Sequence, residues 1–161
     1  MKVIVSDTTN LIVLEGLEAL DLVCKVFESV LIPQAVFNEL AAGSPNIAQK
    51  LQASPCIELI QLNASEQLNN LLLILDQGEA EAITLALEKQ LPILIDERKG
   101  RLIAQQKGLV VTGFLGLLLL AIQRNALTKP EAQQLLDQAI NNGFHVSTKL
   151  YQQVITILSL N

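Results

Sequence analysis

The chain has 161 residues, enough for one domain and too few for two of ordinary size. Half of its residues are hydrophobic but only 3% are aromatic, so it offers few rings on which unpaired bases could stack. Its net charge of −5 argues against a general affinity for nucleic acid, which comes from neutralising phosphates, but does not exclude an enzyme that holds phosphates through a bound metal.

The cysteines and the apolar runs predict where the protein resides. Cys24 and Cys56 are far apart in the sequence and form no CxxC pair, so we interpret them as buried, reduced thiols. The first residues show no signal-peptide pattern, and the longest apolar run, 114–122, is far shorter than the roughly 20 residues that span a bilayer. We therefore expect a cytoplasmic protein that makes no membrane contact.

Short aliphatic runs alternate with helical patterns along the chain. We predict strands at 2–6, 29–32, 56–62, 92–95 and 109–111. Helices are expected at 10–27 with a break near Gly16, and at 33–42, 46–53, 65–75, 78–90, 99–107, 113–124, 128–142 and 148–158. Strands separated by helices indicate right-handed crossovers and a parallel sheet. The prediction is a three-layer α/β/α fold in a single domain, residues 1–161.

Two acidic residues follow predicted strands. Asp7 comes after the first strand and Asp96 after the fourth. In open parallel sheets, functional sites form outside the carboxyl ends of the strands, which makes both residues candidates for a site. Each could also simply cap the helix that follows, because Asp is among the best N-cap residues. The residues alone leave both interpretations open.

Glu79 and Glu81 belong to one predicted helix, 78–90. On a helical wheel at about 100° per residue, Glu79 falls near the centre of the apolar face and Glu81 on the opposite side. A carboxylate on a buried face needs a partner, a metal or a raised pKa. We therefore predict Glu79 as a site residue and Glu81 as a solvated surface charge, although Asp76 to Glu79 also fits a capping box.

Glu39 lies beside the apolar residues of the predicted helix 33–42, and an edge residue reaching solvent is an equal alternative. Four carboxylates without a cysteine and histidine ligand set suit Mg²⁺ or Mn²⁺ better than zinc. The single histidine, His145, lies outside any ligand spacing, and we interpret it as structural. Basic residues soon after Asp96 could contact phosphates or form a solvated helix start: Arg98, Lys99 and Arg101.

The order of these motifs resembles the PIN-domain family. The segment 3–9 (VIVSDTT) is similar to the opening strand and D-x-[ST] motif of that family, and 30–40 to its second acidic motif. The segments 76–83 (DQGEAEAI), 94–101 (LIDERKGR) and 111–113 (VTG) complete the pattern. In detail they resemble the DUF3368 branch, which is PIN-like and related to VapC-type toxins of toxin–antitoxin pairs.

The resemblance implies a parallel sheet of order 3-2-1-4-5 and metal-dependent cleavage of RNA. Asp7, Glu39, Glu79 and Asp96 would be the catalytic, metal-binding carboxylates, with Mg²⁺ or Mn²⁺ as cofactor. Counting from Glu79 places the fourth acid at Glu97, whereas the end of the strand places it at Asp96, which we prefer. The implied partners are an RNA substrate, a small antitoxin protein and a second copy of the chain in a homodimer.

Two other classes of protein fit parts of this pattern. A catalytically inactive PIN-like module that binds RNA or protein would keep the fold without the metal site. A phospho-acceptor receiver domain also has a parallel sheet and clustered acids, but it needs an Asp closing the third strand and a Lys after the fifth. The chain has Leu62-Asn63 and Thr112-Gly113 at those places, which disfavours a receiver.

Overall fold

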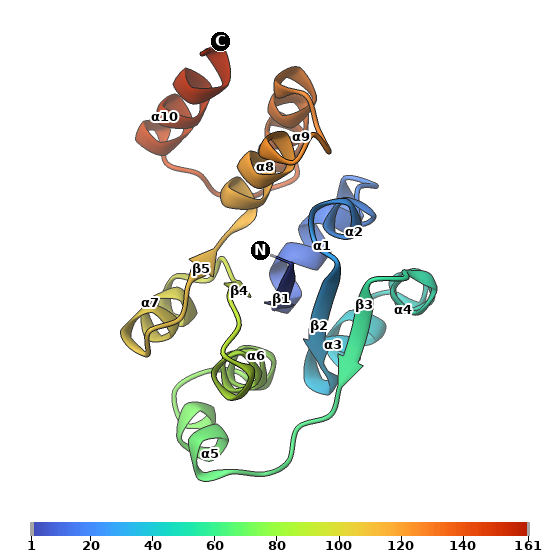
Figure 1. The fold of residues 1–161 in the computed structure, drawn as a ribbon, viewed down its shortest axis with the longest axis vertical. Helices are drawn as coiled ribbons and strands as arrows, with labels where there is room; N and C mark the ends of the chain where they lie inside the picture. The colour runs from blue at the N-terminus through green and yellow to red at the C-terminus, as the bar shows by residue number, and fades with distance from the viewer. Residues whose placement is uncertain (1, 161) are drawn as a thin grey trace.

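A computed structural model describes residues 2–160 as a five-stranded sheet between layers of helices (Figure 1). All four strand pairings are parallel, and the strand order is β3-β2-β1-β4-β5. The strands are β1 (Val3–Ser6), β2 (Ser29–Pro33), β3 (Ile57–Ile60), β4 (Ile93–Leu94) and β5 (Val111–Thr112). The fold class and the strand order predicted from the sequence are confirmed.

The helices lie close to their predicted places. They are α1 (Thr8–Gly16), α2 (Leu22–Val26), α3 (Gln34–Gly43), α4 (Pro45–Ala53), α5 (Glu66–Leu72), α6 (Gln77–Lys89), α7 (Arg98–Gln106), α8 (Phe114–Gln123), α9 (Lys129–Asn141) and α10 (Thr148–Ser159). The break expected near Gly16 is present, and it separates α1 from the short α2. Glu18 follows the break with a left-handed φ of 55°, which a continuous helix cannot accommodate.

Alternate residues of the central strands face opposite sides of the sheet. Ile4, Val30 and Leu94 pack with α1, α2, α4, α8, α9 and α10 on one face. Their neighbours along the strands pack with α5, α6 and α7 on the other face: Val5, Leu31 and Ile93. The central strands are therefore apolar on both faces, as expected of a buried parallel sheet. Each such aliphatic side chain contributes about 1.5–3 kcal/mol when fully buried.

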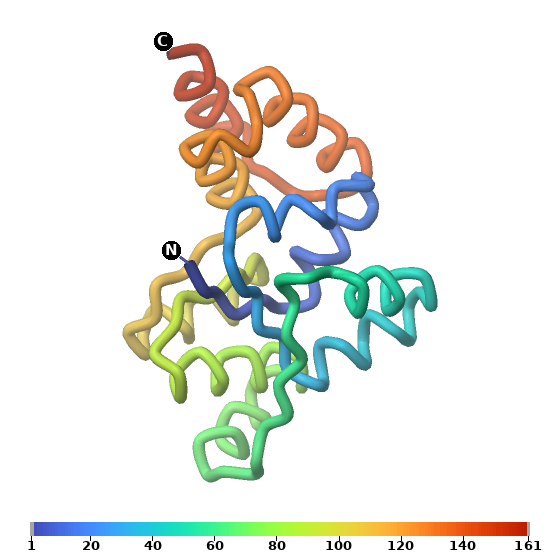
Figure 2. The backbone as a smooth tube through the Cα atoms, turned by 45° about the vertical axis from the view of Figure 1, so that its right-hand side comes forward, coloured from blue at the N-terminus to red at the C-terminus, as the bar shows by residue number. Residues whose placement is uncertain are grey.

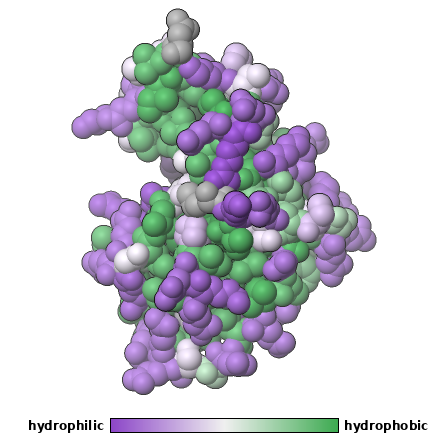
Figure 3. Space-filling view, viewed as in Figure 1, coloured by the Kyte–Doolittle hydropathy of each residue, from purple (hydrophilic) through white to green (hydrophobic). Residues whose placement is uncertain are grey.

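The last three helices lie at one end of the molecule, and α5 lies at the other (Figures 1 and 2). The outline narrows between the part formed by α8, α9 and α10 and the rest of the molecule (Figure 3). The chain passes from β5 to α8 through the single residue Gly113, so α8 begins at the carboxyl edge of the sheet. The loop between α9 and α10 is also brought near this edge, because Phe144 packs edge-to-face on Phe114, with ring centroids 5.1 Å apart.

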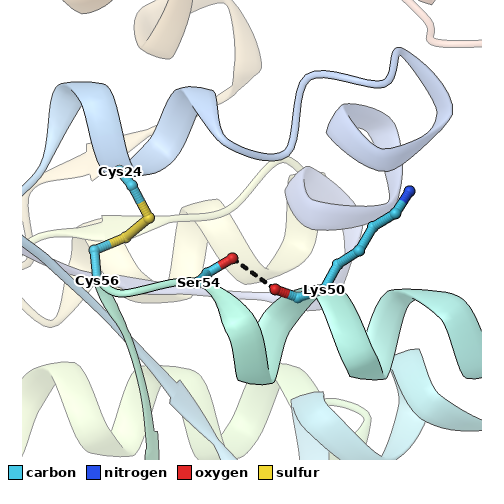
Figure 4. The surroundings of a disulfide bond; sticks show 4 residues. All are labelled: Cys24, Lys50, Ser54 and Cys56. Carbon is cyan, nitrogen blue, oxygen red and sulfur yellow. Dashed lines mark hydrogen bonds between the residues drawn. A yellow bond between two sulfur atoms is a disulfide. The ribbon is translucent and has the colours of Figure 1, made fainter.

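Cys24 and Cys56 form a disulfide bond (Figure 4), so the prediction of two reduced thiols is wrong. Cys24 lies on α2 and Cys56 just before β3, with Cα atoms 5.4 Å apart. The parallel pairing of Val30 with Ile57 brings the start of β3 beside the segment that follows α2, a proximity that the sequence separation of 32 between the cysteines conceals. Disulfides persist mainly in oxidising environments, so the cysteines no longer support a reducing compartment.

Within residues 2–160, no helix is both long and apolar enough to cross a membrane.

Candidate active site

Asp7 occupies the carboxyl end of β1 and caps α1. Its backbone N–H donates to Leu94 O at 3.0 Å, which fixes the residue against β4. Its carboxylate accepts hydrogen bonds from the backbone N–H (3.3 Å) and the side-chain amide (3.4 Å) of Asn10. Only 2% of the residue's surface is exposed, and this burial raises the pKa of Asp7 to about 7. The capping role is therefore present, together with a burial that a surface cap does not need.

Asp96 follows β4 and caps a different helix, α8. Its Oδ2 accepts from the backbone N–H of Phe114 at 3.0 Å. The N-cap of α8 is Gly113, which has no side chain, so the orphan N–H is satisfied by Asp96 instead. A Cβ at Gly113 would collide with Asp96 Oδ1, so this close approach requires glycine. Burial raises the pKa of Asp96, and the Phe114 N–H and the Arg101 guanidinium oppose that rise.

Asn10 joins these two carboxylates, and the sequence did not point to it because the search for metal-binding residues did not include amides. Its side chain is fully buried, and its amide lowers the pKa of both Asp7 and Asp96. Among the described residues, no group donates a hydrogen bond to Asn10 Oδ1. A buried polar atom without a partner is costly, so this oxygen points to a ligand that the protein alone does not supply.

Glu39 reaches the same edge of the sheet from α3. Its Oε2 accepts from the hydroxyl of Thr8, the residue after Asp7, at 3.0 Å. A Cβ at Gly78 would collide with Glu39 Oε1, so Glu39 lies against the first turn of α6. The side chain is exposed, as the alternative interpretation of an edge residue expected. It nevertheless lies between Thr8 and the start of the helix that carries Glu79.

Glu79 lies in the first turn of α6, half-buried, beside two other carboxylates. Burial comes first among the causes that raise its pKa to about 9, followed by its contacts with Asp76 and Glu97. Asp76 caps α6 by accepting from the Glu79 N–H at 2.8 Å. Glu97 caps α7 by accepting from the N–H groups of Lys99 (3.0 Å) and Gly100 (2.6 Å). Asp96 and Glu97 both cap helices, but Asp96 lies with Asp7 and Asn10 whereas Glu97 lies beside Glu79, so we prefer Asp96 as the fourth acid.

Glu81 is buried, so the prediction that it is a solvated surface charge is wrong. Only 9% of it is exposed; its Oε1 accepts from the Ala35 N–H at 3.3 Å and its Oε2 from the Gln77 amide at 3.0 Å. The N-cap of α3 is Pro33, which offers no side-chain acceptor, and Glu81 supplies one from another helix. The helical wheel failed because α6 is enclosed by the sheet, α3 and α5, so that residues 80–86 are all buried.

The four predicted carboxylates thus lie along one edge in two groups. Asp7 and Asp96 share Asn10, while Glu79 is grouped with Asp76 and Glu97, and Glu39 lies between Thr8 and Gly78. Between residues 2 and 160, no three His, Cys, Asp or Glu side chains lie close enough together to hold one metal ion. Mg²⁺ usually keeps several waters and is bound through one or two carboxylates. The Asp7–Asp96 pair with the unpartnered Asn10 Oδ1 fits such an ion.

A parallel sheet of this order, with carboxylates at the ends of β1 and β4, is what the resemblance to PIN domains implied. The family model described as "DUF3368: PIN domain" matches residues 3–159, and the chain therefore belongs to the DUF3368 family of PIN domains. This confirms the resemblance found in the sequence. PIN domains are generally nucleases, and they usually use divalent metal ions.

Other comparisons add little beyond the family. None of the curated proteins matches the chain. Among solved structures, the chain is similar to a PilT N-terminus domain protein from the hyperthermophilic archaeon Sulfolobus solfataricus, at 13% sequence identity and a TM-score of 0.43. The similarity covers 91% of this chain and all of that one.

Proposed function

We propose that the protein is a divalent-metal-dependent endoribonuclease and the toxin of a toxin–antitoxin pair. The observation that carries the nuclease proposal is the pairing of the buried Asp7 with the half-buried Asp96, beside the unpartnered Asn10 Oδ1, at the carboxyl edge of the sheet. All of its candidate ligand atoms are oxygens, which suit Mg²⁺ or Mn²⁺. Membership of a family of nucleases supports the same reading.

In this proposal Asp7 and Asp96 are the residues that would hold the metal, and Glu39 and Glu79 would act on it through water. A bound Mg²⁺ or Mn²⁺ would activate a water molecule for in-line attack on phosphorus and offset the developing negative charge. The Asn10 and Phe114 N–H groups orient the two aspartates before substrate arrives. Glu79 retains a proton near neutral pH in the metal-free protein, which suits a position outside direct coordination.

As a toxin, the protein would bind a small antitoxin protein. We also propose that the chain forms a homodimer. Apolar side chains are exposed at the end of α5, where Leu73 is 83% exposed and its neighbours Leu72 and Ile74 are 40% and 49% exposed. Exposed apolar residues in sequence favour a protein contact. Light scattering of the purified chain, with and without proteins that co-purify from its native host, tests this part. A monomer with no partner would contradict it.

Cleavage of labelled RNA with Mg²⁺, with Mn²⁺ and with excess chelator tests the nuclease proposal. We expect cleavage only with metal, and its loss in Asp96→Asn. The alternative is a PIN-like binding module without catalysis, which is favoured by the absence of three closely grouped metal-binding side chains in residues 2–160. RNA binding without cleavage, together with no rise in melting temperature on adding Mg²⁺ or Mn²⁺, would support that alternative.

A further inference from the structure

A cavity of about 430 Å³ opens beside Asp96, which is the member of the carboxylate groups described above that lines it. Its walls come from three parts of the chain that the fold brings together: α7, the junction of β5 with α8, and the segment from the α9–α10 loop into α10. Residues that matter for its chemistry are Asp96, Arg101, Gly113, Phe144, His145 and Leu150. Its volume falls in the range of roughly 300–1,000 Å³ that is typical of small-molecule sites.

Arg101 supplies a fixed positive charge to this cavity. Its Nη1 donates to Ile95 O at 2.8 Å, and a Cβ at Gly113 would lie only 2.7 Å from that nitrogen. A guanidinium has five N–H donors, and the bond to Ile95 uses one of them. Neither of the two ion pairs within the described part of the chain includes Arg101. The Asp96 carboxylate, whose pKa Arg101 lowers, already offsets part of its charge, and its remaining donors suit an anion that enters from the cavity.

The other basic residues near Asp96 differ from Arg101. Arg98 and Lys99, which the sequence analysis grouped with Arg101, are exposed at the start of α7 and do not line the cavity. His145, interpreted from the sequence as structural, is exposed and lines the cavity. The cavity therefore combines one fixed guanidinium with one imidazole, close to a carboxylate that the proposed function assigns to the metal.

Apolar side chains form the remaining wall. Phe144 is half-buried, and its ring is held edge-to-face against Phe114 at an interplanar angle of 66°. Leu115, Val146 and Leu150 add aliphatic surface around it. Such a wall accepts the flat face of a base, because stacking on aromatic and apolar side chains is tolerant of base identity. Because only 3% of the residues are aromatic, a ring in the cavity wall supports a role in contacting a base.

We propose that this cavity is a nucleotide subsite, which receives one nucleotide of single-stranded RNA beside the phosphodiester bond at Asp96. The base lies against Phe144 and Leu150, and its phosphate binds Arg101 and His145. Bases within a duplex are paired and stacked, so only an unpaired nucleotide can enter. The inference rests on the proposed nuclease function, and it names the substrate class as single strands or loops.

NMR of the only histidine tests the subsite directly. A five-nucleotide single-stranded RNA is titrated into the Asp7→Asn variant with Mg²⁺, in which cleavage is expected to be strongly slowed, while the His145 ring resonances are followed. We expect a saturable shift for the single strand and a much smaller one for a blunt duplex of the same length. An unchanged His145 spectrum while the RNA binds elsewhere, or no RNA binding at all, overturns the subsite.

Substitutions on one helix provide a matched comparison. Arg101→Gln should raise the Kd and KM for RNA about tenfold, because it removes a charge-assisted hydrogen bond to phosphate. Lys107→Gln removes the same charge from the far end of α7 and should change both by less than about twofold. Arg101→Lys should lie between them. Equal effects of Arg101→Gln and Lys107→Gln would overturn the proposal.

His145→Ala covers the case in which Arg101→Gln fails to fold, because His145 lies in an exposed loop. It should weaken RNA binding, with a raised KM and a kcat that changes less. If it leaves KM unchanged while the wild type cleaves RNA, the subsite is wrong and the nuclease function stands. If the wild type binds RNA with the His145 shift but no metal supports cleavage, the nuclease function is wrong and the subsite stands.

Discussion

The two groups of carboxylates at the sheet edge contain the same chemical group but balance its charge in different ways. Asp7 and Asp96 accept hydrogen bonds from backbone N–H groups and share the Asn10 amide, so their negative charge is partly offset within the protein. Glu79 is placed against Asp76 and Glu97, and its burial, followed by its contacts with these two carboxylates, favours its protonated form. In the proposed function the first group holds a cation, whereas Glu79 in the second group holds a proton, although both groups lie at helix starts.

Asp7→Asn is the substitution with the largest expected effect, and it tests whether the first group of carboxylates binds a metal. It should reduce metal-dependent cleavage by a factor of roughly 10²–10³, the usual effect of losing one preorganised electrostatic group. Without metal, the variant should melt at or above the wild-type temperature at pH 8, because a buried carboxylate with a pKa of about 7 is replaced by a neutral amide. Asn also caps helices well, so α1 should not be weakened.

Differential scanning fluorimetry with and without Mn²⁺ measures the metal response of both proteins. Asp21→Asn is the matched control, since Asp21 is an exposed acid in a surface ion pair with Lys25. It should leave cleavage and the Mn²⁺ response unchanged. If Asp7→Asn behaves like this control in both measurements, Asp7 is only a helix cap.

Asn10→Ala tests whether the amide completes the Asp7–Asp96 group. It removes the unpartnered Oδ1 and the hydrogen bond to Asp7, so the affinity for Mn²⁺ should fall roughly 10- to 100-fold, as is common when a group that orients metal ligands is lost. Isothermal titration calorimetry with Mn²⁺ measures this effect without an activity assay. An unchanged affinity would show that Asn10 merely fills the interior.

Glu79→Gln distinguishes the second group by its pH dependence. The pKa of Glu79 is raised from its ordinary value of 4.5 to about 9 in the fold. Between these values the unfolded chain is ionised while the folded protein keeps the proton, so the contribution of Glu79 to stability is present below pH 4.5 and is lost as the pH rises towards 9. Metal-free wild type should therefore lose stability over this range more steeply than Glu79→Gln. Parallel curves would contradict the assignment.

Glu81→Ala tests whether the buried carboxylate of Glu81 on α6 caps the start of α3. It leaves the Ala35 N–H without its acceptor, which should cost about 1–3 kcal/mol in the free energy of unfolding. Because α3 also carries Glu39, cleavage should fall modestly, by less than in Asp7→Asn. Chemical denaturation of Glu81→Ala beside Glu88→Ala, an exposed glutamate on the same helix, separates the cap from helix propensity. Equal losses of stability in Glu81→Ala and Glu88→Ala would contradict the assignment of Glu81 as a cap of α3.

The sequence was sufficient for the architecture because hydrophobic periodicity and strand-end acids are local signals. It predicted the strand order through the family pattern and placed Asp7 and Asp96 at strand ends. It failed where the outcome depends on contacts between elements. The wheel could not show that α3 lies against the Glu81 side of α6, and attention to acids alone passed over Asn10. The spacing of Cys24 and Cys56 also gave no sign that parallel β2–β3 pairing brings them together.

Loss of the Cys24–Cys56 disulfide should have the smallest effect on the site and a large one on stability. The bond closes a segment with a sequence separation of 32, so in the chain-entropy model it stabilises the fold by about 3–4 kcal/mol. For a domain of this size that corresponds to a fall of roughly 10 °C in melting temperature on reduction.

Cys24 lies on α2 and Cys56 precedes β3, at the amino ends of the strands, whereas all the carboxylates lie at the carboxyl ends. Cleavage and the Mn²⁺ response of the Cys24→Ser/Cys56→Ser variant, measured well below its melting temperature, should therefore match those of the wild type. A variant that keeps its melting temperature but loses its Mn²⁺ response would show that the two edges of the sheet are coupled, and that the carboxylate groups cannot be understood from their own contacts alone.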